Sequence, residues 1–221
     1  KHAINGFLAT SVVFANEIAV LCEAVGANAQ EVERGLKTDS RIGSKAYLGP
    51  GAAFAGGTLA RDIAFLQKLG SDVGGNVRLL SAVRTSNDSH KAWALQKIRD
   101  LTGDNVKGRR IAVWGLTYKP GTDTLRRSAS VELCIKLVRL GAEVRVHDPI
   151  VKALPPELGA GITLVASAVE AARGVDLLVI ATEWPEYRQI DAGMIVAAMK
   201  SALVIDATRF LSQTLGSEER I

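Results

Sequence analysis

Apolar residues recur at three- and four-residue spacing along roughly the first hundred positions of the chain, as expected for amphipathic helices. The spacing predicts helices at residues 3–25, 30–36, 62–69 and 77–101. Gly26 is a suitable stop for the first helix, and Asn28 is a suitable cap for the second. The stretch 43–57 is rich in glycine and alanine and is expected to be a loop, because its glycines cannot sustain a helix. Residues 1–104 are therefore predicted to form an all-helical domain.

The pattern changes after Gly108, where short apolar runs alternate with helical segments. Residues 109–115 predict a buried strand, 130–140 a helix and 143–147 a second strand, which together make one β-α-β unit. Further strands are expected at 162–165, 175–180 and 203–205, and further helices at 168–172 and 191–200. The predicted fold class is therefore α/β, with a Rossmann-like doubly wound parallel sheet domain over residues 105–221.

Composition favours a globular protein with small anionic ligands. Of the 221 residues, 48% are hydrophobic and 23% are charged, a balance typical of helices packed on a sheet. The net charge is +4, and the cations are scattered among carboxylates instead of forming a basic run. We therefore expect no nucleic-acid partner.

Both cysteines, Cys22 and Cys134, lie in apolar helical patterns. This placement argues for a reducing, cytoplasmic compartment and against a disulfide or zinc framework. The histidines His2, His90 and His147 have no metal-ligand spacing, so they are interpreted as structural and no metal site is predicted. No signal or spanning segment is apparent, and no membrane partner is expected. The chain opens directly in a helix without a start methionine, which suggests a piece of a longer protein.

Lys1 and Asn5 lie four positions apart and project from one face of the first predicted helix. Such a pair can meet one ligand, although on its own it is more often a solvated lysine beside a surface asparagine. Two further stretches change that balance, 41–43 (Arg-Ile-Gly) and 56–62 (Gly-Gly-Thr-Leu-Ala-Arg-Asp). Together with residues 1–10 they resemble the second half of the UDP-glucose/GDP-mannose dehydrogenase family, NAD-dependent enzymes that oxidise nucleotide-sugars to uronic acids.

The resemblance assigns catalytic roles to Lys1, Asn5, Thr58 and Asp62. In the family, a lysine and an asparagine stabilise oxyanion charge at the sugar carbon being oxidised, and the aspartate holds a water or the lysine ammonium. The family loop is approximately Gly-Gly-Ser-Cys-Phe/Leu-Pro-Lys-Asp, and an ungapped match over residues 50–62 puts Thr58 at the position of the nucleophilic cysteine. An aliphatic hydroxyl stays protonated without an aligned base, whereas a thiol ionises readily. Thr58 is therefore expected to be a poor nucleophile.

The same resemblance assigns substrate-binding roles to Arg41, Gly56 and Gly57. The family arginine reaches across a subunit interface to the sugar of the neighbouring site, and its fixed fork of donors suits hydroxyl or phosphate oxygens. The two glycines would let the backbone approach the ligand and leave amide donors free. The alternative for Arg41 alone is a surface arginine in a turn.

The second domain has its own matching segment, residues 115–126 (Gly-Leu-Thr-Tyr-Lys-Pro-Gly-Thr-Asp-Thr-Leu-Arg), after its first predicted strand. This segment resembles the family's Gly-Leu-x-Phe-Lys-x-x-Thr-x-Asp-x-Arg, in a place where open α/β sheets bind ligands. By this resemblance Lys119 meets phosphate or sugar oxygens, Tyr118 packs against the ligand, and Arg126 fixes the loop or the phosphates. The family's Asp-Gly-Arg appears as Asp-Ala-Thr-Arg at 206–209, which displaces an arginine that normally touches the nucleotide.

The resemblance implies a helical dimerisation domain followed by a UDP-binding domain, from an enzyme that oxidises the C6 alcohol of a nucleotide-sugar. The homodimer would form through the long first helix. No Gly-x-Gly-x-x-Gly fingerprint follows a strand, so NAD is expected to bind mainly to an N-terminal domain that precedes this chain. Two alternatives stay open. One is a nucleotide-sugar binding or regulatory homologue, which Thr58 favours; the other is a related NAD-dependent 3-hydroxy-acid dehydrogenase, which the second α/β domain disfavours.

Overall fold

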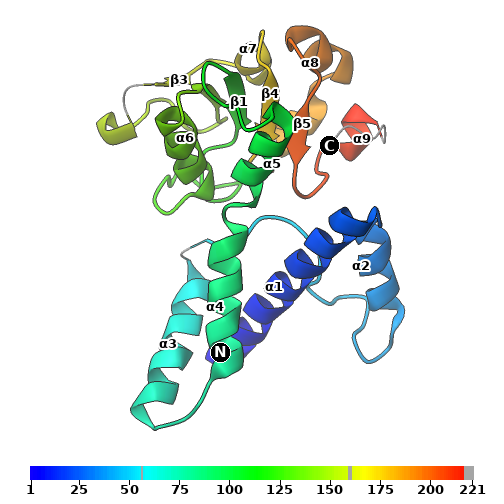
Figure 1. The fold of residues 1–221 in the computed structure, drawn as a ribbon, viewed down its shortest axis with the longest axis vertical. Helices are drawn as coiled ribbons and strands as arrows, with labels where there is room; N and C mark the ends of the chain where they lie inside the picture. Colours follow the sequence, from blue (N-terminus) through cyan, green and yellow to red (C-terminus); the bar gives the residue numbers. More distant parts are fainter. Residues whose placement is uncertain (56, 159–160, 217–221) are drawn as a thin grey trace. The chain divides into compact units, whose positions relative to one another are not determined.

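The computed structural model describes residues 1–55, 57–158 and 161–216. The chain divides into two compact units, Lys1–Ala92, here called the helical unit, and Trp93–Ile221, here called the sheet unit. Figure 1 shows that the first is built from helices and the second from a parallel sheet with helices around it. The predicted α/β fold class is confirmed.

The helical unit contains α1 (His2–Val25), α2 (Ala29–Thr38), α3 (Thr58–Asp72) and α4 (Arg78–His90). α1 ends as predicted at Gly26, which has a φ of 71° and donates its backbone N–H into the last turn. Asn28 caps α2 by accepting from two backbone N–H groups. The core of this unit consists of Ala9, Val13, Ile63 and Val83. These four side chains join α1, α3 and α4.

α3 begins earlier than the sequence predicted, at Thr58 instead of Asp62. Gly57 takes the N-cap position, and the helical hydrogen bonds start at once, with the N–H of Arg61 bound to the Gly57 carbonyl at 3.1 Å. Residues 58–61 of the motif, for which the sequence predicted no helix, are therefore the first turn of α3.

The predicted helix 77–101 is in fact two helices, α4 and α5 (Trp93–Thr102). Ile98 of α5 is fully buried in the core of the sheet unit, so α5 packs with the sheet. The division between the two units therefore falls after Ala92, whereas the sequence prediction put it after residue 104.

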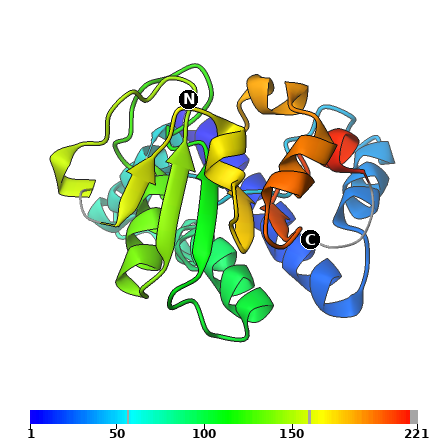
Figure 2. The ribbon, with the colours of Figure 1, turned by 90° about the horizontal axis from the view of Figure 1, so that it is seen from above.

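The sheet unit has parallel strands in the order β3-β2-β1-β4-β5. The strands are β1 (Arg110–Trp114), β2 (Glu143–His147), β3 (Ile162–Leu164), β4 (Leu177–Ile180) and β5 (Val204–Asp206). The helices are α5, α6 (Ala129–Arg139), α7 (Ala168–Ala172), α8 (Ala192–Ala198) and α9 (Ser212–Leu215), with 3-10 turns at Pro156–Leu158 and Pro185–Gln189. One apolar core joins α5 and α6 to one sheet face, and a second joins α7 and α8 to the other (Figure 2). The strand order reverses between β1 and β4, which is the usual ligand position in such sheets.

α1 keeps several large apolar side chains exposed in the helical unit, namely Ile4, Phe7, Phe14, Leu21 and Val25. Among the described residues it is the helix that is long and apolar enough to cross a membrane. Length and composition are weak evidence, because core helices of globular proteins pass the same test. The expectation that no membrane is involved therefore stays a prediction.

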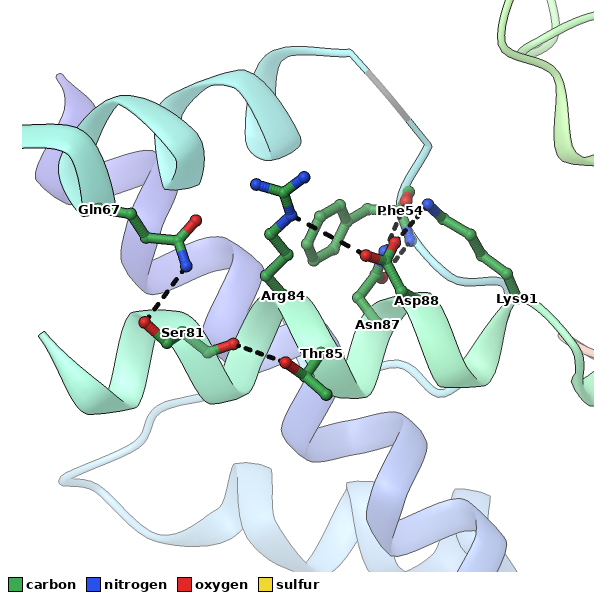
Figure 3. A network of polar contacts seen from close by, with 8 residues as sticks. All are labelled: Phe54, Gln67, Ser81, Arg84, Thr85, Asn87, Asp88 and Lys91. Carbon is green, nitrogen blue, oxygen red and sulfur yellow. Dashed lines mark hydrogen bonds and ion pairs between the residues drawn. The ribbon is translucent and has the colours of Figure 1, made fainter.

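Two buried asparagines hold the loop that leads to α3. Asn87 of α4 accepts from the N–H of Phe54 and donates to the Phe54 carbonyl, both at 2.9 Å (Figure 3). Asn16 of α1 accepts from the N–H of Gly51 at 2.8 Å and donates to the carbonyl of Ala52 at 3.5 Å. Both asparagines are 2% exposed, so their amides replace hydrogen bonds that regular secondary structure would supply.

One buried carboxylate, Asp148, holds the loop that follows β1. Its Oδ2 accepts from the backbone N–H groups of Leu116 at 2.7 Å and Thr117 at 3.0 Å, and from the indole N–H of Trp184 at 3.2 Å. Burial raises the pKa of Asp148, but its backbone hydrogen bonds lower it by more, so the pKa lies below its usual value. Asp148 therefore stays ionised and fixes the loop in place.

Gly115 lets the loop after β1 lie against the loop after β4. Its φ is 90°, and its N–H donates to the carbonyl of His147 at 2.8 Å. A Cβ at this position would lie 2.3 Å from the Cβ of Thr182, whose hydroxyl donates to the Thr117 carbonyl at 2.8 Å. Any side chain at Gly115 would therefore separate the two loops.

We expect Asn87→Ala to lower the free energy of unfolding by about 2–4 kcal/mol, because the N–H and the carbonyl of Phe54 lose their partner in a buried place. Urea unfolding followed by far-UV circular dichroism measures the change. Asn76→Ala is the matched control, since Asn76 is exposed and its replacement is expected to change stability by less than about 0.5 kcal/mol. Equally small effects for both variants would contradict the proposed role of Asn87.

We expect Asp148→Asn to lower the stability of the sheet unit by about 3 kcal/mol at pH 7, because an amide cannot accept from every N–H group that faces the carboxylate. The wild-type advantage is present above the unfolded pKa of about 4 and is lost as pH falls through the lower folded pKa. The two proteins should therefore converge in acid. Tryptophan fluorescence reports this unfolding, since Trp93, Trp114 and Trp184 all lie in the sheet unit. Asp123→Asn, at an exposed position, is the control.

Candidate active site

A buried carboxylate of α3, Asp62, contacts the first turn of α1. Asn5 Nδ2 donates to Asp62 Oδ2 at 2.5 Å, and His2 Nδ1 lies 3.3 Å from Oδ1. Arg61 Nε approaches the same Oδ1 at 3.5 Å, and most of its side chain is exposed. The predicted site residues Asn5 and Asp62, far apart in sequence, are thus brought together.

The surroundings of Asp62 favour its charged form. The hydrogen bond from Asn5 lowers its pKa most, burial opposes this, and His2 and Arg61 lower the pKa further. The net direction is downward, so Asp62 is a carboxylate at neutral pH. A buried negative charge with a fixed orientation can orient a donor such as a hydroxyl or a water.

The sequence interpretation missed His2, which was taken as structural. Its imidazole contacts Asp62 and stacks on the ring of Phe65, with the ring centroids 4.2 Å apart. The spacing of His2 and Asn5, three positions apart at the start of a helix, puts both on one face and could have indicated a shared partner.

Lys1 directly precedes α1 and is exposed. Its carbonyl accepts from the backbone N–H of Asn5 at 3.1 Å, which closes the first turn. Among the described residues, the side chains that contact the Asp62 carboxylate are those of Asn5, His2 and Arg61. The role of the Lys1 ammonium therefore stays a prediction.

Thr58 is the first residue of α3 and is exposed. It precedes Asp62 by one helical turn, so the two side chains share a face of α3. Gly57 is the N-cap and has no side chain to satisfy the first backbone N–H groups, while Gly56 lies outside the described residues. The partial positive charge of the helix N terminus is therefore located at Thr58.

Arg41 lies in the turn after α2 with its side chain 88% exposed. Its Nε and Nη2 donate to the two oxygens of Asp39 at 3.0 and 2.6 Å. This pairing raises the pKa of Arg41 and lowers that of Asp39. The guanidinium is free of neighbours on most of its surface, and its predicted role at a neighbouring subunit is not tested by one chain.

Tyr118, Lys119 and Arg126, the predicted ligand residues of the sheet unit, are all exposed on the loop between β1 and α6. The loop closes on itself, with the N–H of Tyr118 bound to the carbonyl of Thr124 at 3.0 Å. The side chains of this loop are therefore available to a ligand from solution. Arg209, the displaced arginine, is exposed in a left-handed conformation with φ 53°.

A cavity of about 370 Å³ lies at the carboxyl ends of β2 and β3 in the sheet unit. It is lined by His147, Asp148, Val151, Lys152, Leu164, Val165 and Ala166. None of the predicted ligand residues lines it. Burial lowers the pKa of His147 most, and although Asp148 opposes this, the net direction is downward.

Cys22 and Cys134 are both free and buried. Burial raises the pKa of Cys134 to about 12, so its thiol is unreactive. Within the part of the chain that the structure describes, no group of three or more His, Cys, Asp or Glu could hold a metal ion.

Comparison with known protein families divides the chain into two parts that correspond, in the same order, to the helical unit and the sheet unit. The model of the central domain of the UDP-glucose/GDP-mannose dehydrogenase family matches residues 1–89, and the model of its UDP binding domain matches residues 112–213. A UDP-glucose 6-dehydrogenase from Rhizobium meliloti is 39% identical over 206 residues, which is 93% of this chain and 47% of that protein.

Solved structures agree. A UDP-glucose dehydrogenase from the hyperthermophilic archaeon Pyrobaculum islandicum superposes with a TM-score of 0.83 at 30% identity, over 96% of this chain and 48% of its own. A UDP-D-ManNAc dehydrogenase from Pyrococcus horikoshii superposes with a TM-score of 0.78 at 27% identity, over 95% of this chain and 47% of its own. The chain thus spans about half the length of the relatives it matches.

The central-domain match falls in the helical unit and includes Asn5, Thr58 and Asp62, while the UDP-binding match falls in the sheet unit. These matches confirm the resemblance drawn from the sequence motifs. The chain belongs to the UDP-glucose/GDP-mannose dehydrogenase family.

Proposed function

We propose that this chain is part of an NAD-dependent dehydrogenase that oxidises the C6 alcohol of a nucleotide-sugar. The observation that supports this most is the buried Asp62 carboxylate, bonded to Asn5 and preceded by Thr58 one turn earlier on α3. Family membership gives the reaction class, because the relatives are nucleotide-sugar dehydrogenases. Asp62 and its partner Asn5 mark the part of this chain where that reaction would occur.

In the proposed reaction the alcohol loses a hydride to NAD⁺ and a proton to a base or an ordered water, which leaves an aldehyde and NADH. Asn5 and the Lys1 ammonium stabilise the oxygen as it gains negative charge, and Asp62 orients them or a water. NAD itself would be bound mainly by a part of the protein other than the two units of this chain, since no dinucleotide fingerprint follows β1.

The sheet unit would bind the nucleotide. Lys119 and Arg126 are exposed cations on the loop after β1, at the end of the sheet where ligands bind, and suit the two phosphates. Tyr118, 38% exposed, offers an aromatic face to the base or ribose. Gly56 and Gly57, before α3, and Arg41, from a second subunit, would contact the sugar.

A second candidate keeps the fold without the chemistry, as a nucleotide-sugar binding or regulatory homologue. Thr58 favours it, because a threonine hydroxyl is a weak nucleophile unless a base is aligned on it. The retained Asn5 and Asp62 pair speaks against it. For either candidate we propose a cytoplasmic location, which suits two free buried cysteines.

We expect the full-length protein to release about one NADH per nucleotide-sugar and to form an aldehyde, because covalent capture of the aldehyde needs an activated nucleophile. Thr58→Ala should change the rate by less than about tenfold, or ~1.4 kcal/mol of barrier. A panel of nucleotide-sugars, with NADH followed by absorbance and products by mass spectrometry, measures both.

Thr58→Cys should allow a second oxidation and a covalent adduct on the new cysteine, because the N terminus of α3 stabilises a thiolate there. Thr38→Cys, at an exposed position in α2, is the control and should form no adduct. Two NADH per sugar with a threonine-linked intermediate in the wild type would overturn the role given to Thr58. No NADH from wild type or Thr58→Cys, together with tight nucleotide-sugar binding, would favour the binding homologue.

We also propose that α1 forms a homodimer with a second copy of the chain. Its exposed apolar side chains, Phe7 at 73%, Leu21 at 61% and Val25 at 77%, are unusual on a protein surface and follow one side of the helix. Burial of such side chains in an isologous contact would remove them from water.

Sedimentation velocity at micromolar concentration is expected to give a dimer for the wild type and a monomer for Leu21→Glu, because a charge in the apolar contact lacks a partner. Val73→Glu is the control: Val73 is equally apolar and 73% exposed but lies at the end of α3, so this variant should remain dimeric. A wild-type monomer would contradict the dimer.

A further inference from the structure

Asp62 has a different partner on each of its two oxygens. Asn5 donates to Oδ2, and the imidazole of His2 approaches Oδ1 through Nδ1 at 3.3 Å. A carboxylate with one oxygen fixed can still rotate about its last bond, whereas a carboxylate fixed at both oxygens cannot. The orientation of Asp62 therefore depends on His2 as well as on Asn5.

The imidazole is itself held in place by an aromatic side chain of α3. It stacks on Phe65 of α3 with 4.2 Å between the ring centroids and 29° between the planes, and 47% of the side chain is exposed. The stack on Phe65 therefore keeps Nδ1 facing the carboxylate.

We propose that His2 is a positioning residue for Asp62, and that its imidazole holds the carboxylate in the orientation that polarises the bound sugar hydroxyl or water. This inference rests on the proposed function. His2 and Arg61 both approach Oδ1, at 3.3 and 3.5 Å, while Asn5 donates to Oδ2. Most of the Arg61 side chain is exposed, whereas the His2 ring is fixed by its stack on Phe65, so His2 is the group better placed to orient the carboxylate.

The charged groups that face His2 come from α3 and from the chain just before α1. Asp62 and Arg61 belong to α3, and Lys1 is the neighbour of His2 in sequence. α4 packs on both α1 and α3. Its apolar Leu80 lies close to Gly6 of α1, one turn after His2.

Two variants separate the hydrogen bond to Asp62 from the ring itself. His2→Asn retains an N–H donor close to the position of Nδ1 and should keep kcat close to that of the wild type. His2→Leu removes the donor and should lower kcat by about tenfold, with little change in KM.

Steady-state kinetics of the full-length enzyme test this through kcat and KM, with Thr58→Cys as background if the wild type is slow. His147→Gln in the sheet unit is the control and should leave kcat and KM unchanged. The inference is overturned if His2→Asn is as slow as His2→Leu, or if His2→Leu matches the wild type. A change in KM alone, with kcat unchanged, also overturns it.

A second measurement does not depend on activity. Carbon-13 NMR of the Asp62 carboxyl in the 221-residue chain should give a pKa that rises in His2→Leu and rises further in Asn5→Ala, because each variant removes one group that favours the carboxylate. An unchanged pKa in His2→Leu would overturn the inference. If the pKa rises but no nucleotide-sugar yields NADH, the pairing of His2 with Asp62 stands and the proposed function alone fails.

Discussion

Buried backbone groups outside helices and strands must find hydrogen-bond partners, and in this chain three polar side chains supply them at the places where function is expected. Asn16 and Asn87 bond to the backbone between Gly51 and Phe54, and this fixes the approach to the N terminus of α3. Asp148 does the same for the loop after β1. Because these loops are held by side chains, their conformation depends on single residues from distant elements.

The sequence predicted most elements from periodicity, since apolar spacing records which side of an element is buried. α1, α2 and the five strands were predicted at or close to their observed positions. The break between α4 and α5 was not predicted, for an understandable reason. The helical spacing continues through Lys91 and Ala92, and only the burial of Ile98 against the sheet assigns α5 to the second unit. Periodicity identifies an apolar face but not the surface that covers it.

The site residues that belong to a sequence motif could be predicted. The site residues that meet only through packing of distant helices could not. Asn5 and Asp62 were predicted from the family resemblance, and the structure gives a hydrogen bond between them. His2 was missed because its partners, Asp62 and Phe65, lie far away in the sequence and come close only when α1 packs on α3. Asn16 and Asn87 were missed for the same reason. A polar residue in an apolar helical pattern indicates a buried partner but does not identify it.

The position of Thr58 separates two parts of the chemistry that the family combines. In the proposed reaction, oriented donors and the N terminus of α3 would stabilise negative charge on the reacting oxygen, and neither depends on the side chain at position 58. Covalent capture of the aldehyde would depend on the side chain at position 58. The partial positive charge at the N terminus of α3 can favour an anion there only if that side chain can ionise. A hydroxyl in the same field remains neutral. Under the proposed function, the arrangement around Asp62 would therefore support the first hydride transfer, while the second would need a better nucleophile than the hydroxyl of Thr58.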